Sequence, residues 1–156
     1  MKKLIILLSL ISFNAIGAGT SSNTDDSSET SDQIITLYEL AEKHIDNQSY
    51  DKSLKLLKKL TKREDLGTKR ADIYNLLGFS YRKLENPDLD KSFAAYMMAI
   101  EIDPSHLGAH EYLGELYLMR DQKDKAVIIL KKLDQLAGSN TEEYRELKIA
   151  IDEYQS

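Results

Sequence analysis

The sequence contains no cysteine, and it has only two prolines and seven glycines among its 156 residues. Without cysteine the chain can form no disulfide, offer no thiolate to a metal ion, and carry no thiol nucleophile and no lipid on an N-terminal cysteine. Proline and glycine are the poorest helix formers, whereas Leu, Lys, Glu, Ala and Ile are abundant here. The composition therefore predicts a helical protein.

A block of basic residues is also lacking. The chain has 21 Lys and Arg against 26 Asp and Glu, which gives a formal net charge of −5. Nucleic acids and anionic lipids are bound largely through clustered positive charge, so we expect no nucleic-acid partner. The acids and bases are interspersed along the chain, as is typical of solvated helix surfaces.

The motifs that bind nucleotides or position a catalytic serine are absent, since the chain has no GxGxxG, no GxxxxGK[ST] and no GxSxG. Carboxylate pairs such as Glu111 and Glu115 are numerous. Acid–base catalysis by such a pair, however, needs a pocket that drives the two pKa values apart. We therefore expect no enzymatic activity and no cofactor.

The first residues, MKKLIILLSLISFNAIGAG, have the three parts of an export signal. Lys2 and Lys3 supply positive charge, residues 4–13 are apolar apart from two serines, and small residues follow that fit a cleavage site. The apolar stretch is far shorter than the roughly 20 residues that span a membrane. We predict a signal peptide at 1–19 and a periplasmic or secreted protein with no membrane span after cleavage. An uncleaved anchor is the alternative.

Residues 20–33 are rich in Ser, Thr and Asp and contain no large apolar side chain. Such a segment buries too little apolar surface to offset the entropy lost on ordering. We therefore predict a disordered linker at 20–33.

Two stretches of the remaining chain, ADIYNLLGFSYRKL and LGAHEYLGELYLMR, align with each other. The Leu-Gly pair at 77–78 and Tyr81 in the first correspond to the pair at 113–114 and Tyr117 in the second, at a constant offset of 36 residues. Each stretch is followed by a second helical pattern, and a weaker copy lies upstream at 34–60. The chain thus reads as three helix–turn–helix units and a seventh helix.

This pattern resembles the tetratricopeptide repeat (TPR), which has Leu-Gly and Tyr on its first helix, small and aromatic residues on its second, and a proline at its exit. The middle copy matches at Tyr74, Leu77, Gly78, Tyr81, Ser92, Tyr96, Ala99 and Pro104. The ending EEYRELKIAIDEY is similar to that of exported bacterial TPR proteins. The resemblance implies an all-α fold, a right-handed α-solenoid of about three repeats with a capping helix.

We accordingly expect a TPR domain at 34–156. Its repeats would occupy about 34–67, 71–106 and 107–140, and its capping helix 141–154. Three repeats are about the minimum at which such units bury a continuous core.

Local features add detail to this expectation. Gly78 and Gly114 are expected where the two helices of one repeat cross closely. Ser105 can cap the helix that follows Pro104. Capping boxes are offered by Ser139 with Glu142 and by Thr30 with Gln33.

The three histidines include one pair with the spacing of zinc ligands. His106 and His110 are four residues apart, so both could lie on one helix face. The stretch HLGAH lacks the glutamate of the HExxH motif. His106 falls at a helix start, and His110 and His44 fall at packing positions of the repeats. We predict structural roles for all three and no metal site.

The resemblance also implies a partner-binding groove on the concave side, lined by the first helix of each repeat. The groove positions are Ile35, Tyr38, Glu42 and Ile45 in the first repeat, Asp72, Asn75, Phe79 and Arg82 in the second, and Gly108, Glu111, Glu115 and Leu118 in the third. Their spacing of three or four residues keeps each set on one helix face. These residues mix apolar groups with acids and lack the several basic residues with which some TPR domains grip a C-terminal carboxylate.

The sequence therefore predicts a scaffold or adaptor that binds a protein or peptide, extended or helical, with apolar anchors and some positive charge. A chain that self-associates through its repeats is an alternative, as is a metal-binding protein or an enzyme with a site that the sequence hides. The acids at Glu42, Glu111 and Glu115 could also be solvated surface only.

Overall fold

The computed structural model describes the backbone of residues 26–155, and the side chains from residue 31 onward. The predicted signal peptide at 1–19 and the first part of the predicted linker, at 20–25, lie outside the described residues. The described chain forms seven α-helices and no strand. They are α1 (Asp26–Asp46), α2 (Tyr50–Leu60), α3 (Lys69–Arg82), α4 (Leu89–Ile102), α5 (Leu107–Met119), α6 (Lys123–Ala137) and α7 (Glu142–Glu153).

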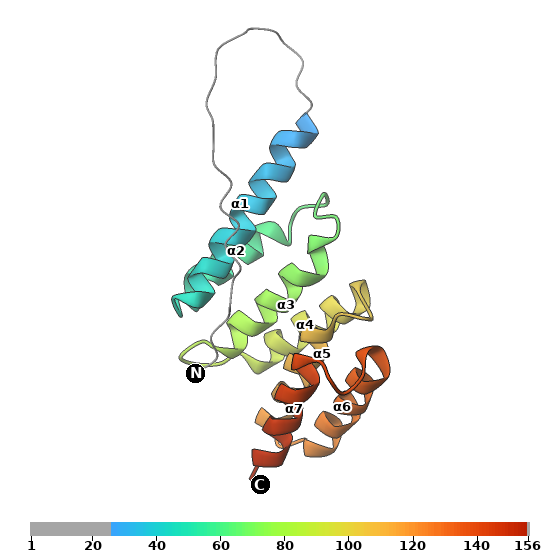
Figure 1. Ribbon diagram of the computed structural model, residues 1–156. Coiled ribbons are helices and arrows are strands. Elements are labelled where there is room, and N and C mark those ends of the chain that lie inside the picture. Colours follow the sequence, from blue (N-terminus) through green and yellow to red (C-terminus); the bar gives the residue numbers. More distant parts are fainter. Residues whose placement is uncertain (1–25, 156) are drawn as a thin grey trace, which may run out of the picture.

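Successive helices pack in antiparallel pairs, α1 with α2, α3 with α4 and α5 with α6, and the pairs stack along one axis to form a rod (Figure 1). The odd-numbered helices also contact one another from pair to pair. Helix α7 packs on both α5 and α6 and closes the C-terminal end. The chain is an all-α helical repeat solenoid, as the sequence predicts. None of the described helices is both long and apolar enough to cross a membrane.

Helix α1 begins earlier than expected. The sequence predicts a disordered linker up to residue 33, but the backbone is helical from Asp26. Ile34, Tyr38 and Ala41 bury one side of α1 against α2 and α3, and this packing establishes the helix. Once a helix is nucleated, each further residue adds a hydrogen bond at little cost, so polar residues can extend it. For residues 26–33 the prediction of disorder is therefore wrong.

The core runs along the rod as three groups of buried apolar side chains. One group joins α1 and α2 to α3 through residues such as Leu57 and Ile73. A second group lies between α4 and α5 around the fully buried Tyr96. The third joins α5 and α6 to α7 through Leu133 and Leu147. Each repeat thus buries its apolar face against its neighbours, as expected of stacked units.

The two repeat glycines permit close approaches, but to different partners. A Cβ at Gly78 would lie 2.6 Å from the Tyr96 ring on α4, the second helix of the same repeat. A Cβ at Gly114 would lie 2.5 Å from Leu147, which belongs to α7. The expectation that both glycines face their own second helix is therefore confirmed for Gly78 and wrong for Gly114, because α7 packs directly on α5.

The helix caps also differ from those expected. The N-cap of α5 is His106, whose Nδ1 accepts a hydrogen bond from Ala109 N, while Ser105 instead donates to Asp103. The N-cap of α7 is Thr141, not Ser139, and its hydroxyl accepts from Tyr144 N. Thr30, expected to cap α1, lies inside it. In the first two cases the residue next to the helix takes the cap because its acceptor reaches the free N–H groups.

Candidate functional site

The odd-numbered helices present one continuous side of the solenoid, which we call the inner face. It comprises Tyr38 and Glu42 of α1, Asp72 and Phe79 of α3, His106 at the N-cap of α5, and Glu115 within α5. Of the twelve groove positions predicted from the sequence, seven are partly or fully exposed, namely Ile35, Glu42, Ile45, Asp72, Phe79, Gly108 and Glu115. The other five are buried, namely Tyr38, Asn75, Arg82, Glu111 and Leu118. The groove predicted from the sequence is thus only partly open.

At the α1–α3 end of the inner face, a lysine joins an aromatic ring to a carboxylate. Lys69 Nζ lies 4.6 Å from the centre of the Tyr38 ring and 3.5 Å from Asp72 Oδ2. The Tyr38 hydroxyl is hydrogen-bonded to Glu42. Burial, and next the negative charge of Glu42, raise the pKa of Tyr38 well above its ordinary value. Tyr38 is therefore a permanent neutral donor at this end of the face.

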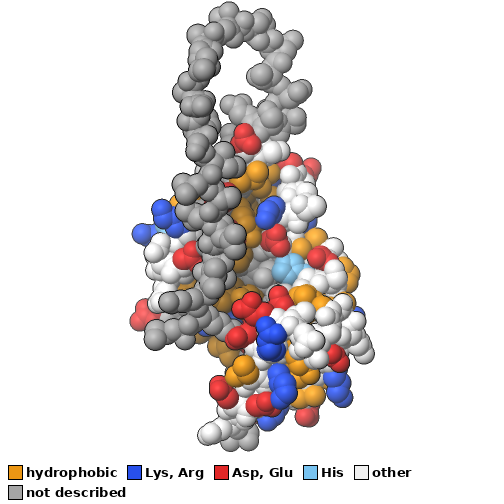
Figure 2. Space-filling model, in the orientation of Figure 1, with side chains coloured by type: hydrophobic (Ala, Val, Ile, Leu, Met, Phe, Trp, Pro, Cys, Tyr) orange, Lys and Arg blue, Asp and Glu red, His pale blue; other side chains and the backbone are white. Residues whose placement is uncertain are grey.

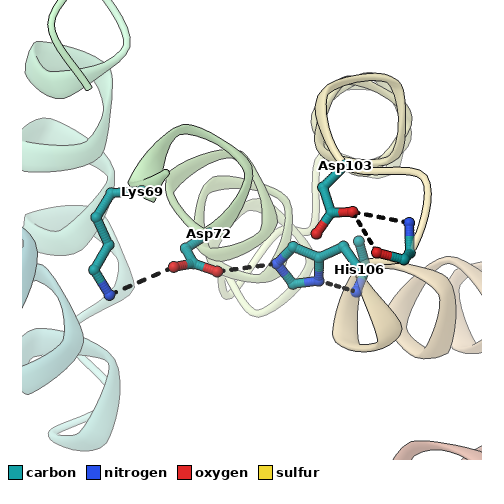
Figure 3. A network of polar contacts seen from close by, with 6 residues as sticks. Lys69, Asp72, Asp103 and His106 are labelled. Atoms are coloured by element: carbon teal, nitrogen blue, oxygen red, sulfur yellow. Dashed lines mark hydrogen bonds and ion pairs between the residues drawn. The ribbon is translucent and has the colours of Figure 1, made fainter. Parts of the chain in front are cut away.

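Asp72 is held from the other side by His106 (Figure 3). Its Oδ1 lies 3.2 Å from His106 Nε2, across the junction between α3 and α5. His106 Nδ1 accepts a hydrogen bond from Ala109 N at 3.1 Å, so Nδ1 carries no proton. The neutral ring must then carry its proton on Nε2 and donate it to Asp72. A chain of contacts thus runs from Lys69 through Asp72 and His106 to the first turn of α5.

In the middle of the inner face, Arg82 of α3 forms an ion pair with Glu115 of α5. Arg82 is 5% exposed, and its guanidinium carbon lies 5.5 Å from the Phe79 ring and 5.2 Å from the Tyr112 ring. Stacking and pairing of this kind suit the planar guanidinium. Arg82 was expected to line an open groove, but it is a buried link between two repeats.

An aromatic row accompanies this ion pair. The rings of Tyr50, Phe79, Tyr112 and Tyr96 follow one another with centroid separations of 6.2, 5.1 and 6.0 Å. The first three are partly exposed, while Tyr96 is fully buried. The row runs from α2 of the first repeat, through α3 and α4 of the second, to α5 of the third. It therefore joins all three repeats. Partly exposed aromatic rings offer large apolar contact area at low entropic cost.

The C-terminal end of the predicted groove is filled. Leu118 is 8% exposed and packs in the core with Leu147 and Ile151 of α7. Glu111 is likewise buried. The prediction placed both residues on an open surface because they occupy the groove positions that the TPR resemblance implies. Helix α7 packs closely against α5, and this packing removes Leu118 from the accessible face.

The sequence reasoning missed several residues of the inner face. It singled out Tyr38 and Asp72 but gave no role to Lys69 or Tyr112, and it assigned His106 only to a helix start. These three lie one helix turn or one repeat away from predicted positions. A signal for His106 was present, because it lies two residues before Gly108, the position equivalent to Asp72 in the next repeat.

The two histidines with zinc-ligand spacing do not converge. His106 contacts Asp72 and Ala109 N, whereas His110 Nε2 lies 3.0 Å from the carbonyl oxygen of Pro104. Burial lowers the pKa of His110, and its Nδ1 has no hydrogen-bond partner. Among residues 31–155, no group of three or more His, Asp or Glu side chains is arranged to hold a metal ion.

The inner face also carries the carboxylates of Glu42, Asp72 and Glu115, of which the last two are paired with Lys69 and Arg82. Burial raises the pKa of Glu42, and the nearby Asp46 and Asp72 act in the same direction while Lys69 opposes them. Figure 2 shows one side of the molecule, on which acidic side chains lie beside hydrophobic patches and a histidine. The face therefore combines apolar surface with carboxylates across successive repeats.

Two shallow hollows lie at turns between helices. One is formed by residues 121–125 at the turn between α5 and α6. The other lies between the turn at 48–52 and the end of α3 near Leu84. His106 lines neither hollow, and its Nδ1 is occupied by the backbone cap of α5.

No protein-family model matches the sequence, and no curated protein matches it. Solved structures do match the fold. Two crystal structures of MamA align with TM-scores of 0.63 at 22% and 21% identity, over 76% and 80% of this chain. The chain spans 67% and 66% of those two MamA chains, about two thirds of their length.

The type III secretion chaperone SycD of Yersinia enterocolitica, solved with a peptide of the translocator YopD, aligns with a TM-score of 0.64 at 19% identity. The alignment covers 78% of this chain and 88% of SycD. MamA and SycD are both TPR-like, all-helical proteins. The chain therefore has a TPR-type fold, as the repeats in its sequence predict.

Proposed function

We propose that this TPR-type chain is a protein-interaction scaffold that binds a segment of a partner protein on its inner face. The observation that carries the proposal is the pair of links between successive repeats, Asp72 to His106 and Arg82 to Glu115. These links hold partly exposed aromatic rings and carboxylates in one surface that spans α1, α3 and α5. A preformed surface of this kind lowers the entropic cost of binding.

The fold neighbours support a peptide as the bound element. SycD was crystallised with a peptide of YopD, and it shares the fold of this chain over most of its length. The present inner face offers Phe79 and Tyr112 for apolar anchors and Glu42 and Asp72 for positive charge. We infer an extended or helical segment with apolar residues and some basic ones, consistent with electrostatic complementarity.

We propose further that the chain does no chemistry of its own and needs no metal or cofactor. In its best candidate base, His106, both ring nitrogens are engaged. Nδ1 accepts a hydrogen bond from Ala109 N, and Nε2 is hydrogen-bonded to Asp72. The carboxylates of the inner face lie on an open surface, where water is not excluded.

The place of action is proposed from the N-terminal sequence. The charged, apolar and small-residue parts of residues 1–19 are typical of a bacterial export signal. We therefore propose the bacterial cell envelope, with the scaffold acting in the periplasm or outside the cell. Fractionation of cells that express the full chain tests this, because recovery in the cytoplasm at full length would contradict export.

The binding proposal is tested by placing a photo-crosslinking amino acid at Ile35 or at Met97 of the full chain in its native host. Ile35 is 47% exposed and lies on α1 seven residues before Glu42, hence on the same helix face. Met97 is 42% exposed on α4, which belongs to the other helix layer. We expect a specific partner to be captured from Ile35 and not from Met97. Capture only from Met97, or none from Ile35, would contradict an inner-face scaffold.

A second candidate, self-association, is favoured by apolar side chains on α4. Met97, Met98 and Ile102 are all at least 37% exposed on that helix. Light scattering of the purified chain distinguishes the candidates, because a monomer at micromolar concentration argues against self-assembly. A dimer that Met98→Lys dissociates would instead favour it.

A further inference from the structure

The α1–α3 end of the inner face already holds one ammonium group. Lys69 Nζ lies over the Tyr38 ring at 4.6 Å and 3.5 Å from Asp72 Oδ2, and the charge of Glu42 also attracts it. An ammonium between an aromatic face and a carboxylate, with a second carboxylate nearby, is a favourable arrangement for a cation. The structure therefore contains a cation site that is filled from within the chain.

The groups that surround this ammonium are fixed by contacts of their own. Asp72 is held by His106 Nε2, and His106 is held in turn by the first turn of α5. Glu42 accepts a hydrogen bond from the Tyr38 hydroxyl, and the Tyr38 side chain is 9% exposed. Three helices thus orient the ring and both carboxylates without help from Lys69.

Lys69, by contrast, is weakly held. Its side chain is 46% exposed, and its distance to Asp72 is near the outer limit for an ion pair. Exposed pairs of this kind contribute about 0–1 kcal/mol. Lys69 is also the first residue of α3, where the helix dipole disfavours a positive charge. The lysine can therefore leave at small cost, whereas the site that it occupies stays formed.

From this contrast we propose that Tyr38, Glu42 and Asp72 form a subsite for a Lys or Arg side chain of the partner segment, and that Lys69 occupies it in the free protein. Binding exchanges one cation for another and leaves Lys69 to enter solvent. The subsite gives the partner segment a fixed position relative to Phe79, further along α3. This inference rests on the proposed function and names the chemistry that the inner face selects.

The test begins with selection of binders to the full chain from a displayed library of random 12-residue peptides. For an enriched peptide, the Kd is measured against the wild type and against Asp72→Asn, Lys69→Ala and Lys91→Ala. The side-chain oxygen of Asn at position 72 can still accept a hydrogen bond from His106 Nε2, but the negative charge of the carboxylate is lost. Lys91 is the matched control, because it also pairs with a carboxylate, Asp88, and lies 5.6 Å from a tyrosine ring, Tyr81. Thermal unfolding checks that each variant is folded.

We expect enriched peptides to share a Lys or Arg whose replacement by norleucine weakens binding about tenfold, and Asp72→Asn to weaken binding to a similar extent. Lys69→Ala should strengthen binding about threefold because it removes the internal competitor. Lys91→Ala should leave the Kd of the peptide unchanged. In the Asp72→Asn variant, replacing the shared Lys or Arg of the peptide by norleucine should hardly weaken binding further.

Three results would overturn the inference. If peptides are enriched without a shared basic residue, or if Lys69→Ala weakens or does not change their binding, the subsite is wrong while the scaffold function stands. If no peptide is enriched over an unrelated helical protein, peptide binding itself fails, and the subsite falls with it.

Discussion

The two ends of the inner face are built from equivalent positions of the repeat, and one of these positions is covered differently. Glu42 of α1 and Glu115 of α5 are both partly exposed, and Tyr38 and Glu111 are both buried. The last position differs, because Ile45 of α1 stays partly exposed whereas Leu118 of α5 is buried where α7 packs against α5. The role of a repeat position therefore depends on which helix packs next to it, and the four predictions below probe that difference.

The largest effect is expected from the buried ion pair between the two ends. Glu115→Ala leaves the Arg82 guanidinium buried without its countercharge, which should lower the free energy of unfolding by about 3 kcal/mol. Asp72→Ala at the open end should cost less than about 1 kcal/mol, because that carboxylate is 39% exposed and pairs with an exposed lysine. Urea denaturation measures both values.

The double variant Arg82→Met with Glu115→Leu serves as the control for this pair. It replaces both charges by apolar groups and should recover most of the lost stability. Equal costs for Glu115→Ala and Asp72→Ala would show that the middle of the face is as solvated as its open end.

The next effect compares one repeat position at the two ends. Leu118→Ala should lower the free energy of unfolding by about 3 kcal/mol, because its side chain is buried against α7 and its loss leaves a cavity. Ile45→Ala, the corresponding change in α1, should cost about 1 kcal/mol, because Ile45 is partly exposed. A Leu118→Ala variant as stable as Ile45→Ala would mean that α7 does not cover α5 in solution.

The two repeat glycines give a smaller difference. At Gly78 a new Cβ would meet the fully buried Tyr96 ring and also Ser92 O at 3.1 Å, so Gly78→Ala should cost about 2 kcal/mol. At Gly114 the three atoms nearest to the Cβ all belong to the flexible Leu147 side chain, so Gly114→Ala should cost about 1 kcal/mol, partly offset by better helix propensity. Thermal unfolding should therefore rank Gly78→Ala as less stable, and the reverse order would contradict the contrast between Tyr96 and Leu147.

The smallest expected effect is on the pH dependence of stability, to which the buried His110 of α5 contributes. Because burial lowers the pKa of His110, the unfolded chain binds more protons than the folded one below about pH 6.5, and stability falls as the pH falls. His110→Gln should make the free energy of unfolding less dependent on pH between 7 and 5. The change is expected to stay within about 1 kcal/mol.

His44→Gln on α1 is the control for the pH experiment, because it removes a histidine that is only partly buried. Denaturation at several pH values gives the slopes. An unchanged slope in His110→Gln would show that this imidazole can take up its proton without cost in the folded state.

Much of the fold could be predicted from the sequence because its signals are local. Leu77-Gly78 and Tyr81, repeated 36 residues later, indicate the helix pairs, and Pro104 lies just beyond the end of α4. The caps were less predictable. Ser105 and His106 both carry acceptors, and only the path of the backbone between α4 and α5 decides which one reaches Ala109 N.

The candidate site was predicted only in part. Tyr38, Glu42, Asp72 and Phe79 were identified from repeat spacing, whereas Lys69 and Tyr112 were not. Their contribution depends on contacts such as Lys69 to the Tyr38 ring, which join residues 31 positions apart. Whether that face binds peptides remains a prediction.

By itself the sequence determined that this chain is helical, that its helices come in pairs, and which side of each helix is apolar, since these properties follow from residues three or four positions apart. Only the tertiary structure decided which of the equivalent surface positions stay open. Exposure is set by the helix that packs next to each position. For α5 that helix is α7, which buries Leu118, whereas the equivalent Ile45 at the opposite end of the face stays partly exposed.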